Sequence, residues 1–496
     1  METRRARIAG AALLVASAIP IWSVRFFPSQ DGPSHLYNAR LLTALLDPAN
    51  VRLREFFEFN PGLHPNLLAH ALLAGLQAVV SPLLAEKILL TALVVLLPLS
   101  LLCLLRAVER GRDVYALAAL PFAYHHLLHL GFYSFSLGLS LCFFTLAFFW
   151  PRRTRVTLGG VLGVNALLLL TYLAHFGPFA MALVGMAIGL AAVPLAAGEG
   201  SRGERLRRAV LGGLPVVPAG LLGLAYLLAG SDGFTKYVSA EKLRTVFFER
   251  MLLTSYTTWQ ETLAPWLLGC LAVALIFTAA DRTRRRVGLL PRDAFLVFSA
   301  LLAVLFFTLP RWMNDGGFVN DRVFLLFFLL AWVGMAPPPR RLAVALGAVL
   351  LACAGAHLGR LSWEYARLQP ELRAVTAAVE RIEPHSTVAY RQLARRSAAF
   401  ERYPRYVDPF AHVDSYYGMG EDVVLFDNYE THFDYFPLRA TAAARVDPDY
   451  VVVWPLAAEE PLPEDLRGHA ILHRANGLAL LERTKKGNQE RGRSRR

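Results

Sequence analysis

Cysteine and charge are both scarce in this chain. Its 496 residues include four cysteines, and charged residues make up only 18% of the total. The cysteines lie inside apolar runs and lack the paired spacing of zinc ligands or redox sites, so no disulfide or zinc framework is expected. They are expected to pack as small apolar side chains. The four are Cys103, Cys142, Cys270 and Cys353.

Three widespread catalytic motifs are absent as well. The sequence contains no Gly-x-x-x-x-Gly-Lys-Ser/Thr loop, no His-Glu-x-x-His and no Gly-x-Ser-x-Gly. These motifs supply the phosphate cradle of P-loop proteins, the zinc ligands of metallopeptidases and the nucleophile of serine hydrolases. ATP-driven transport, zinc proteolysis and serine hydrolysis therefore lose their usual support.

Long apolar runs are what the chain has in abundance. Hydrophobic residues make up 55% of it, in runs of about the 17 to 25 residues that a membrane-spanning helix needs. The formal net charge is +13, but arginines gather in short clusters between the runs, where they act as topology signals rather than as a nucleic-acid surface. The composition predicts a polytopic membrane protein with the lipid bilayer, and no nucleic acid, as partner.

Hydropathy predicts a first span at 8–27, although this basic-then-apolar start also fits a signal peptide. Segment 66–83 is ambiguous, because it is apolar but short and contains a histidine, a glutamine and a proline. If it does not span, the arginine clusters all fall on one side together with the basic N-terminus, as the positive-inside rule requires. The further predicted spans are 85–105, 114–130, 132–150, 156–174, 176–197, 209–229, 263–280, 293–310, 321–337 and 341–357.

These spans define the predicted architecture. We expect a mainly α, polytopic helical bundle of about eleven spans, with a cytoplasmic N-terminus. Residues 1–357 form the membrane domain, 358–484 a small α/β domain on the outer face, and 485–496 a disordered basic tail. In the tail domain a helix is predicted at 370–382, with strands at 387–390 and 450–454.

The long first outer loop, 28–84, opens with an acidic motif. A carboxylate held at a membrane boundary costs several kcal/mol unless it is paired, which makes it a functional candidate. Pro33 favours a helix start, and leucines at helical spacing predict an amphipathic helix lying in the interface. Asp31, His35 and Asn38 are spaced four and three apart and would share one face of it. A plain turn that caps the helix is the alternative.

Other polar residues near span ends also gather on the predicted outer side, whereas the inner side has mainly arginine. A transport path is expected to place ionisable groups within the spans as well, so chemistry at the outer face is the simpler interpretation. His125, His126 and His129 lack a carboxylate at ligand spacing, and interfacial polar residues explain them better than a metal site does.

With Asp31 at the head of a long first outer loop, a further outer loop after the seventh span and an outer C-terminal domain, the chain resembles the GT-C glycosyltransferases. It is most similar to the bacterial relatives of protein mannosyltransferases and aminoarabinose transferases. The resemblance covers essentially the whole chain, with residue matches at 31–39 and weaker ones at 133–138. It implies a bacterial inner-membrane enzyme that moves a sugar, with inversion, from a polyprenyl-phosphate carrier to a glycan, lipid or protein acceptor on the outer face.

The resemblance also assigns roles. Asp31 matches the first-loop acid that acts as general base on the acceptor or helps to orient it, and His35 can assist it. Many relatives carry a second acid directly after the first, whereas this chain has Gly32, so no metal ligand set and no cofactor is predicted. Cations are needed to meet the lipid phosphate. The candidates for that role are Lys236, Arg244, Arg311 and Arg322. The candidate substrate-binding residues are Asn38, His64, His129, Tyr133 and His175.

Two other classes stay open. A transporter of lipid-linked or ionic substrates is also polytopic, but it usually shows internal repeats and paired broken spans, and no convincing repeat is found. A polysaccharide polymerase or ligase acts on carrier-linked sugars too. Its key loop is expected late in the chain with paired arginines, so the first-loop acid would not be central.

Overall fold

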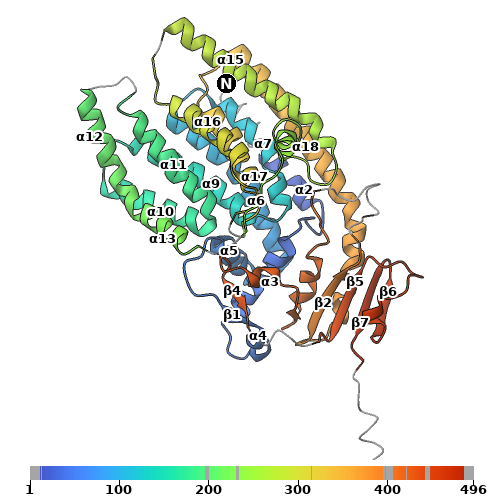
Figure 1. The fold of residues 1–496 in the computed structure, drawn as a ribbon. Helices are drawn as coiled ribbons and strands as arrows, with labels where there is room; N and C mark the ends of the chain where they lie inside the picture. Colours follow the sequence, from blue (N-terminus) through green and yellow to red (C-terminus); the bar gives the residue numbers. More distant parts are fainter. Residues whose placement is uncertain are drawn as a thin grey trace, which may run out of the picture. The chain divides into compact units, whose positions relative to one another are not determined.

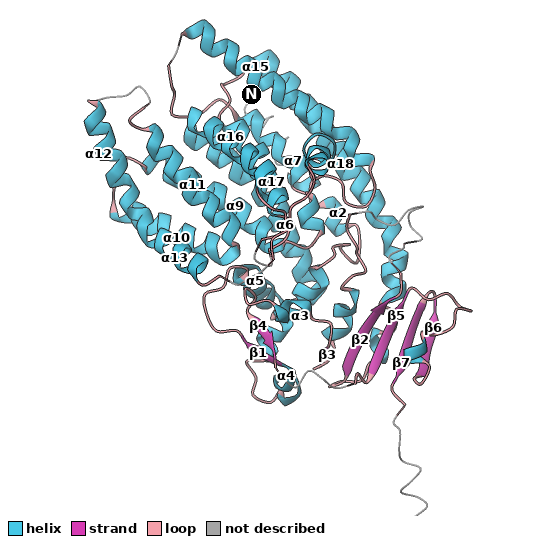
Figure 2. Ribbon diagram, viewed as in Figure 1, coloured by secondary structure: helices cyan, strands magenta, loops and turns pink. Residues whose placement is uncertain are grey.

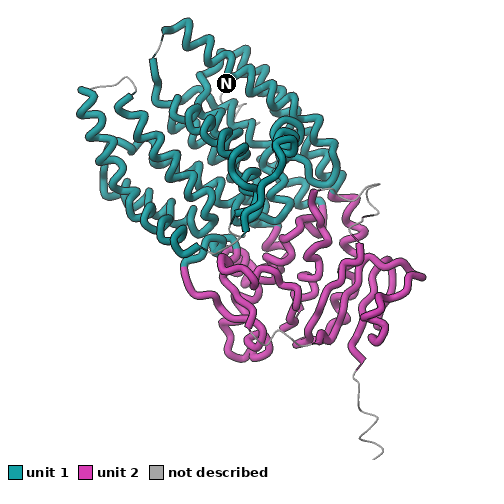
Figure 3. The backbone as a smooth tube through the Cα atoms, in the orientation of Figure 1, with its two compact units in different colours: residues 1–23, 63–69, 87–364 teal, residues 24–62, 70–86, 365–496 magenta. Residues whose placement is uncertain are grey.

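A computed structural model describes residues 12, 14–195, 200–230, 234–286, 288–313, 316–394, 397, 406–420, 422–441 and 447–484. The chain separates into two compact units (Figure 3). Unit 1 comprises residues 1–23, 63–69 and 87–364, and unit 2 comprises residues 24–62, 70–86 and 365–496. The first loop is thus grouped largely with the C-terminal region. The predicted basic tail 485–496 and the start of the predicted first span lie outside the described residues.

Unit 1 is built from helices (Figures 1 and 2). In it α9 packs against α10 and α11, and α16 packs against α11 and α17. A glycine allows one of these approaches: a Cβ added to Gly185 on α11 would lie 2.8 Å from the Phe298 ring on α16.

The helices are α2 (Ile19–Trp22), α6 (Pro82–Val108, which begins in unit 2), α7 (Ala119–Phe122), α8 (His126–His129), α9 (Tyr133–Phe149), α10 (Leu158–Ala174), α11 (Phe176–Ala192), α12 (Arg202–Gly213), α13 (Val217–Leu228), α14 (Ala240–Thr245), α15 (Ala264–Arg285), α16 (Asp293–Thr308), α17 (Val319–Val333) and α18 (Arg340–Val375, which ends in unit 2).

Short 3₁₀ and π segments connect or extend these helices. In unit 1 they are η1 (Asp113–Ala118), η2 (Trp150–Arg152), η3 (Leu214–Val216), the π-helix η4 (Val246–Arg250) and η5 (Trp259–Leu263).

Several helices are suited to a membrane. Within the described residues, five helical stretches are long and apolar enough to cross a bilayer: Pro82–Val108, Tyr133–Arg152, Arg202–Leu228, Trp259–Arg285 and Arg340–Arg381. Shorter apolar helices include α5 (Leu67–Gln77), α10, α11 and α16. With its 11 residues, α5 extends about 16 Å, roughly half the thickness of a hydrocarbon core. These features confirm a mainly helical fold of membrane type, and the total of about eleven spans stays a prediction.

The predicted span 114–130 is wrong as a single helix. The segment is divided into η1, α7 and α8, and nearly all of it is buried. His125 adopts an extended backbone, and its ring accepts a hydrogen bond from the Leu128 amide, so a new helix begins there. Tyr115 and Tyr124 donate to the backbone carbonyls of Ala336 and Ser17. Hydropathy could not predict these breaks, because a buried segment divided into short helices is as apolar as one continuous helix.

Arg112, an arginine of the loop after α6, has a structural role in unit 1. The Arg112 side chain is fully buried and donates to the carbonyls of Leu105 (3.0 Å), Glu109 (3.1 Å), Met335 (3.2 Å) and Val333. These carbonyls belong to the ends of α6 and α17 and the residues just after them, where helical carbonyls lack partners and a cation is favoured.

Unit 2 contains the helices of the first loop and the strands (Figure 2). Five strands form a mixed sheet in the order β3-β2-β5-β7-β6, in which β2 runs parallel to β3 and β5 and the other pairs are antiparallel. The elements are α3 (Gly32–Ala44), α4 (Val51–Phe56), most of α5, β1 (Phe57–Phe59), β2 (Thr387–Gln392), β3 (Val424–Leu425), β4 (Leu438–Ala440), β5 (Tyr450–Trp454), β6 (Ala470–Ala475), β7 (Leu478–Glu482), η6 (Val379–Arg381), η7 (Val413–Met419), η8 (Tyr429–His432) and η9 (Glu464–Leu466).

The two predicted strands are confirmed as β2 and β5, which pair in register from Val388–Tyr450 to Gln392–Trp454. Asp449, the residue before β5, holds the first residue of β2 in place, because its carboxylate accepts hydrogen bonds from both the amide and the hydroxyl of Thr387, at 2.9 and 2.8 Å. One face of the sheet packs on a cluster of buried apolar side chains: Val451, Val453, Leu456, Leu466, Ala479 and Leu481. A short antiparallel pair, β1 with β4, joins the first loop to the C-terminal region within unit 2.

Two helix predictions need correction. The helix predicted to begin near 370 does not begin there, because α18 continues through Pro370 to Val375 and is followed by η6. α3 begins at Gly32 with Pro33 in its first turn, as predicted, but it is not an amphipathic surface helix. Its polar residues Ser34, His35 and Asn38 are buried along with its apolar ones.

Candidate functional site

Asp31 precedes the first residue of α3. It occupies the N-cap position with helical backbone angles, and the His35 amide donates to the Asp31 carbonyl at 3.1 Å. The helical turn therefore extends back to Asp31, and Asp31, His35 and Asn38 follow one another along the helix as the spacing predicted.

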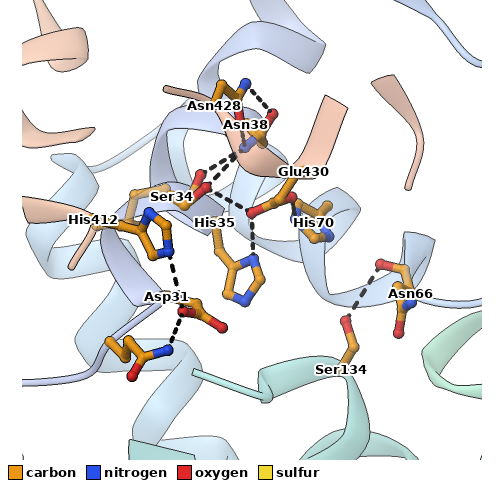
Figure 4. Close-up of polar contacts among 12 residues, drawn as sticks. Asp31, Ser34, His35, Asn38, Asn66, His70, Ser134, His412, Asn428 and Glu430 are labelled. Carbon is orange, nitrogen blue, oxygen red and sulfur yellow. Dashed lines mark hydrogen bonds and ion pairs between the residues drawn. The ribbon is translucent and has the colours of Figure 1, made fainter. Parts of the chain in front are cut away.

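The Asp31 carboxylate is buried, with 7% of the residue exposed. Gln30 donates to it at 3.2 Å, and His412 Nε2 lies 3.6 Å away (Figure 4). The His412 ring lies against the Tyr429 ring at an interplanar angle of 32°, with 4.6 Å between ring centroids. Burial raises the pKa of Asp31 from its usual 3.8, and the neighbouring imidazoles of His412 and His35 oppose that rise. A buried carboxylate beside imidazoles can accept a proton more readily than a solvated one.

A second carboxylate, that of Glu430 on η8, lies between two imidazoles. His35 Nδ1 donates to Glu430 Oε1 at 2.7 Å, and His70 Nε2 donates to Oε2 at 2.8 Å (Figure 4). The two rings meet edge to face, with 5.0 Å between centroids. Burial works to raise the pKa of Glu430, but the two imidazoles outweigh it and hold that pKa below its usual range. All three side chains are buried, and their nitrogen and oxygen atoms lie close enough together to hold a metal ion.

Neighbouring polar side chains orient Glu430. Ser34 Oγ donates to Glu430 Oε1 at 3.0 Å, and Asn38 Nδ2 lies 3.3 Å from the same hydroxyl. Asn38 and Asn428 exchange two amide hydrogen bonds, each of 2.9 Å. Asn38, a predicted substrate contact, therefore connects α3 to the chain that leads into η8.

The predicted phosphate-binding cations all belong to unit 1. Lys236 and Arg311 are joined through their backbones, since the Arg311 amide donates to the Lys236 carbonyl at 2.8 Å. The Arg311 guanidinium lies 3.1 Å from the Asp321 carboxylate. Arg322 covers the Phe132 ring, with its guanidinium carbon 5.0 Å from the centroid.

Electrostatic coupling shows which of these cations are neighbours. The pKa of Lys242 on α14 is lowered first by burial and then by the positive charges of Arg311, Arg250 and Lys236, with Asp321 opposing. Arg244, another residue of α14, is exposed. Lys236 and Arg311 thus belong to one group of cations, in which Arg311 pairs with Asp321 and Arg250 lies 3.6 Å from Glu261, and a group of cations can bind an anion such as a phosphate.

The other predicted substrate contacts also belong to unit 1, and two of them make contacts within their own segments. The His175 ring accepts from the Gly177 amide at 2.9 Å and caps α11. His129 Nδ1 lies 3.1 Å from the His125 carbonyl, and its ring meets Tyr256 edge to face. Tyr133, the first residue of α9, is buried, and His64 is half-buried.

The histidines and the acid that complete the cluster were not predicted from the sequence. His70 is the histidine of the ambiguous apolar segment 66–83, and a histidine in such a segment is the available signal. His412 and Glu430 lie in short polar stretches of the C-terminal region, more than 360 residues after α3, and no spacing rule connects them to it.

Comparison of the chain with protein-family models gives no match, and comparison with curated protein sequences gives none either.

Proposed function

We propose that this protein is an inverting membrane glycosyltransferase that takes a sugar from a polyprenyl-phosphate carrier, with Asp31 as its general base. The observation that carries the proposal is a buried carboxylate at the start of α3 whose ion-pair partner, among the residues that the structure describes, is an imidazole, His412 at 3.6 Å. An arginine in that place would hold the carboxylate as an inert ion pair. The apolar helices of unit 1 support the membrane setting, for which about eleven spans are proposed.

The proposed reaction is a single displacement. The acceptor hydroxyl or amine attacks the anomeric carbon while its proton passes to the Asp31 carboxylate. The bond between the anomeric carbon and the phosphate oxygen breaks, and the polyprenyl phosphate leaves with the electron pair. A proton acceptor and a group that meets the leaving charge are the two parts this chemistry requires. The proposal assigns acceptor activation to Asp31 and binding of the lipid phosphate to the cations near Arg311.

Replacing the acid tests the first role. Asp31→Asn keeps the size of the side chain and should leave the protein folded and inserted, but reduce sugar transfer at least about a thousandfold, because general-base catalysis contributes that order of rate. Transfer is measured by mass spectrometry of surface glycans and glycolipids in a deletion strain complemented with each variant. Asp434→Asn, which changes an exposed acid of the same unit, is the matched control. Substantial transfer by the Asp31 variant would remove the acid from catalysis.

A second substitution tests the phosphate role. Arg322→Gln should weaken binding of a polyprenyl-phosphate sugar by about tenfold, the worth of one charge-assisted hydrogen bond of ~1.5 kcal/mol. Titration of the carrier-linked sugar against purified variants measures this, with Arg284→Gln, an exposed arginine, as control. Equal binding by the parent and the Arg322 variant would exclude this residue from the donor site.

A further inference from the structure

We propose that His35, His70 and Glu430 form a binding site for a divalent transition-metal ion, with Zn²⁺ as the preferred ion. The site lies wholly within unit 2 and does not depend on the proposed sugar transfer. It joins α3, α5 and η8, three segments that are far apart in the sequence.

The donor set and its spacing fit such an ion. Two imidazole nitrogens and one carboxylate are the protein ligands of many zinc sites, whereas Mg²⁺ and Ca²⁺ favour oxygen ligands. The candidate ligand atoms all lie within 4.8 Å of one another. Ligands about 2.0–2.2 Å from a tetrahedral zinc are roughly 3.3 Å apart. The contacts of 2.7 and 2.8 Å between the imidazoles and Glu430 therefore need to open by only about half an ångström.

Charge balance favours a dication. Two buried carboxylates contact residues of the first turn of α3 or precede it, and in the described part of the chain imidazoles lie against both: His35 and His70 against Glu430, and His412 against Asp31. A dication held by His35, His70 and Glu430 would place positive charge beside the buried Glu430 carboxylate, and neutral imidazole is the form that binds metals.

The surrounding contacts are those that orient metal ligands. Ser34 donates to the same Glu430 oxygen that His35 contacts, and the Asn38–Asn428 pair lies behind Ser34. The Phe436 ring lies near both imidazoles, with centroid separations of 6.4 Å to His35 and 5.6 Å to His70. Hydrogen bonds to a ligating carboxylate and an apolar wall are typical of the shell around a protein metal site.

The test measures metal content and affinity of the full chain. The protein is purified in detergent through an affinity tag that contains no histidine, stripped with a chelator and reloaded with Zn²⁺, Mn²⁺ or Mg²⁺. Inductively coupled plasma mass spectrometry then counts bound ions, and competition with a chromophoric chelator gives the zinc affinity. We expect about one tightly held Zn²⁺ per chain, in keeping with a three-ligand site, and no retention of Mg²⁺.

Variants locate the ion. His70→Ala and Glu430→Gln should each lower zinc affinity more than about 100-fold, and Ser34→Ala, which removes only a contact to the ligand, by about 10- to 100-fold. His432→Ala removes an exposed histidine two residues from Glu430 and should change nothing. Co²⁺ loaded in place of Zn²⁺ should give a visible ligand-field spectrum with the parent and His432→Ala, and lose it with His70→Ala.

Failure to retain any transition metal in the parent protein overturns the proposal, and the three side chains are then a hydrogen-bonded triad. That result does not depend on whether a variant folds. Equal zinc loss from His432→Ala, or zinc retained by His70→Ala with unchanged affinity, overturns it too, because the ion would then be bound elsewhere. Sugar transfer can persist in either case, so this test and that of Asp31 fail separately.

Discussion

Buried carboxylates have different counter-groups in the two units. In unit 1 three of them are held by arginine, which stays charged at every physiological pH. The pairs are Asp293 with Arg282 at 2.8 Å, Asp321 with Arg311 at 3.1 Å and Glu364 with Arg360 at 2.9 Å. In unit 2 the carboxylates of Asp31 and Glu430 face imidazoles instead.

The difference separates structural acids from chemically adjustable ones. An arginine pair has one protonation state, so it can hold helices together but cannot exchange a proton. An imidazole can be charged, neutral or bound to a metal, and it leaves the carboxylate beside it able to change state. We therefore expect substitutions of the arginine-paired acids of unit 1 to affect mainly stability, and substitutions of Asp31 and Glu430 in unit 2 to affect chemistry as well.

The largest loss of stability is expected from a substitution of Glu430. Glu430→Gln places an amide N–H₂ against groups that donate to both carboxylate oxygens, and it should destabilise unit 2 by about 3–5 kcal/mol, the usual cost of breaking a buried ionic contact. Thermal unfolding of the purified protein, followed by limited proteolysis, measures the change. Glu459→Gln is the matched exposed control. An unchanged unfolding midpoint would show that the two imidazoles do not depend on this charge.

A smaller loss of stability is expected from a substitution of Glu364. Its carboxylate accepts from Gln260 and Arg360, each at 2.9 Å, and from Thr257. Glu364→Gln should cost about 2 kcal/mol, because the arginine is partly exposed and regains water. A thiol-reactive dye reports unfolding of unit 1, since Cys142, Cys270 and Cys353 are buried there. Glu249→Gln, which changes an exposed acid, is the control. A loss of stability as large as that of Glu430→Gln would contradict the contrast between the two units.

The smallest change in stability, a gain instead of a loss, is expected from a substitution of Asp414 on η7. Burial first, and then the charge of Asp427, raises the pKa of Asp414 well above its usual 3.8. The folded state then binds the proton more tightly than the unfolded state, so stability falls as pH rises from about 4 toward the raised pKa. Asp414→Asn should remove this pH dependence and stabilise unit 2 at pH 7 by no more than about 1 kcal/mol, because an amide oxygen accepts backbone N–H groups more weakly.

Unfolding midpoints of the parent and this variant between pH 4 and 8 test the prediction. A parent whose stability rises with pH over that range, or a variant with the same pH slope, would contradict it.

Local patterns predicted local structure well. The long apolar runs became α6, α9 and α15, the proline marked the start of α3, and β-branched residues identified β2 and β5. The prediction of one continuous helix was wrong for 114–130, which is divided into short helices. The helix start predicted near residue 370 was wrong because α18 continues through Pro370. The face of α3 that presents Asp31 and His35 could be predicted from spacing alone. The partners Glu430, His70 and His412 could not, because tertiary folding brings them to α3 from separate segments.

The contacts of Arg112 affect how experiments on the orientation of the chain in a membrane should be interpreted. Such studies commonly neutralise arginines next to a span and ask whether the chain inserts the other way round. Here one guanidinium fills four carbonyl acceptors at the ends of two helices, a task that the single ammonium of lysine cannot reproduce. A charge-removal scan through this loop would therefore report a damaged bundle at Arg112, while the exposed Arg110 beside it would report insertion alone.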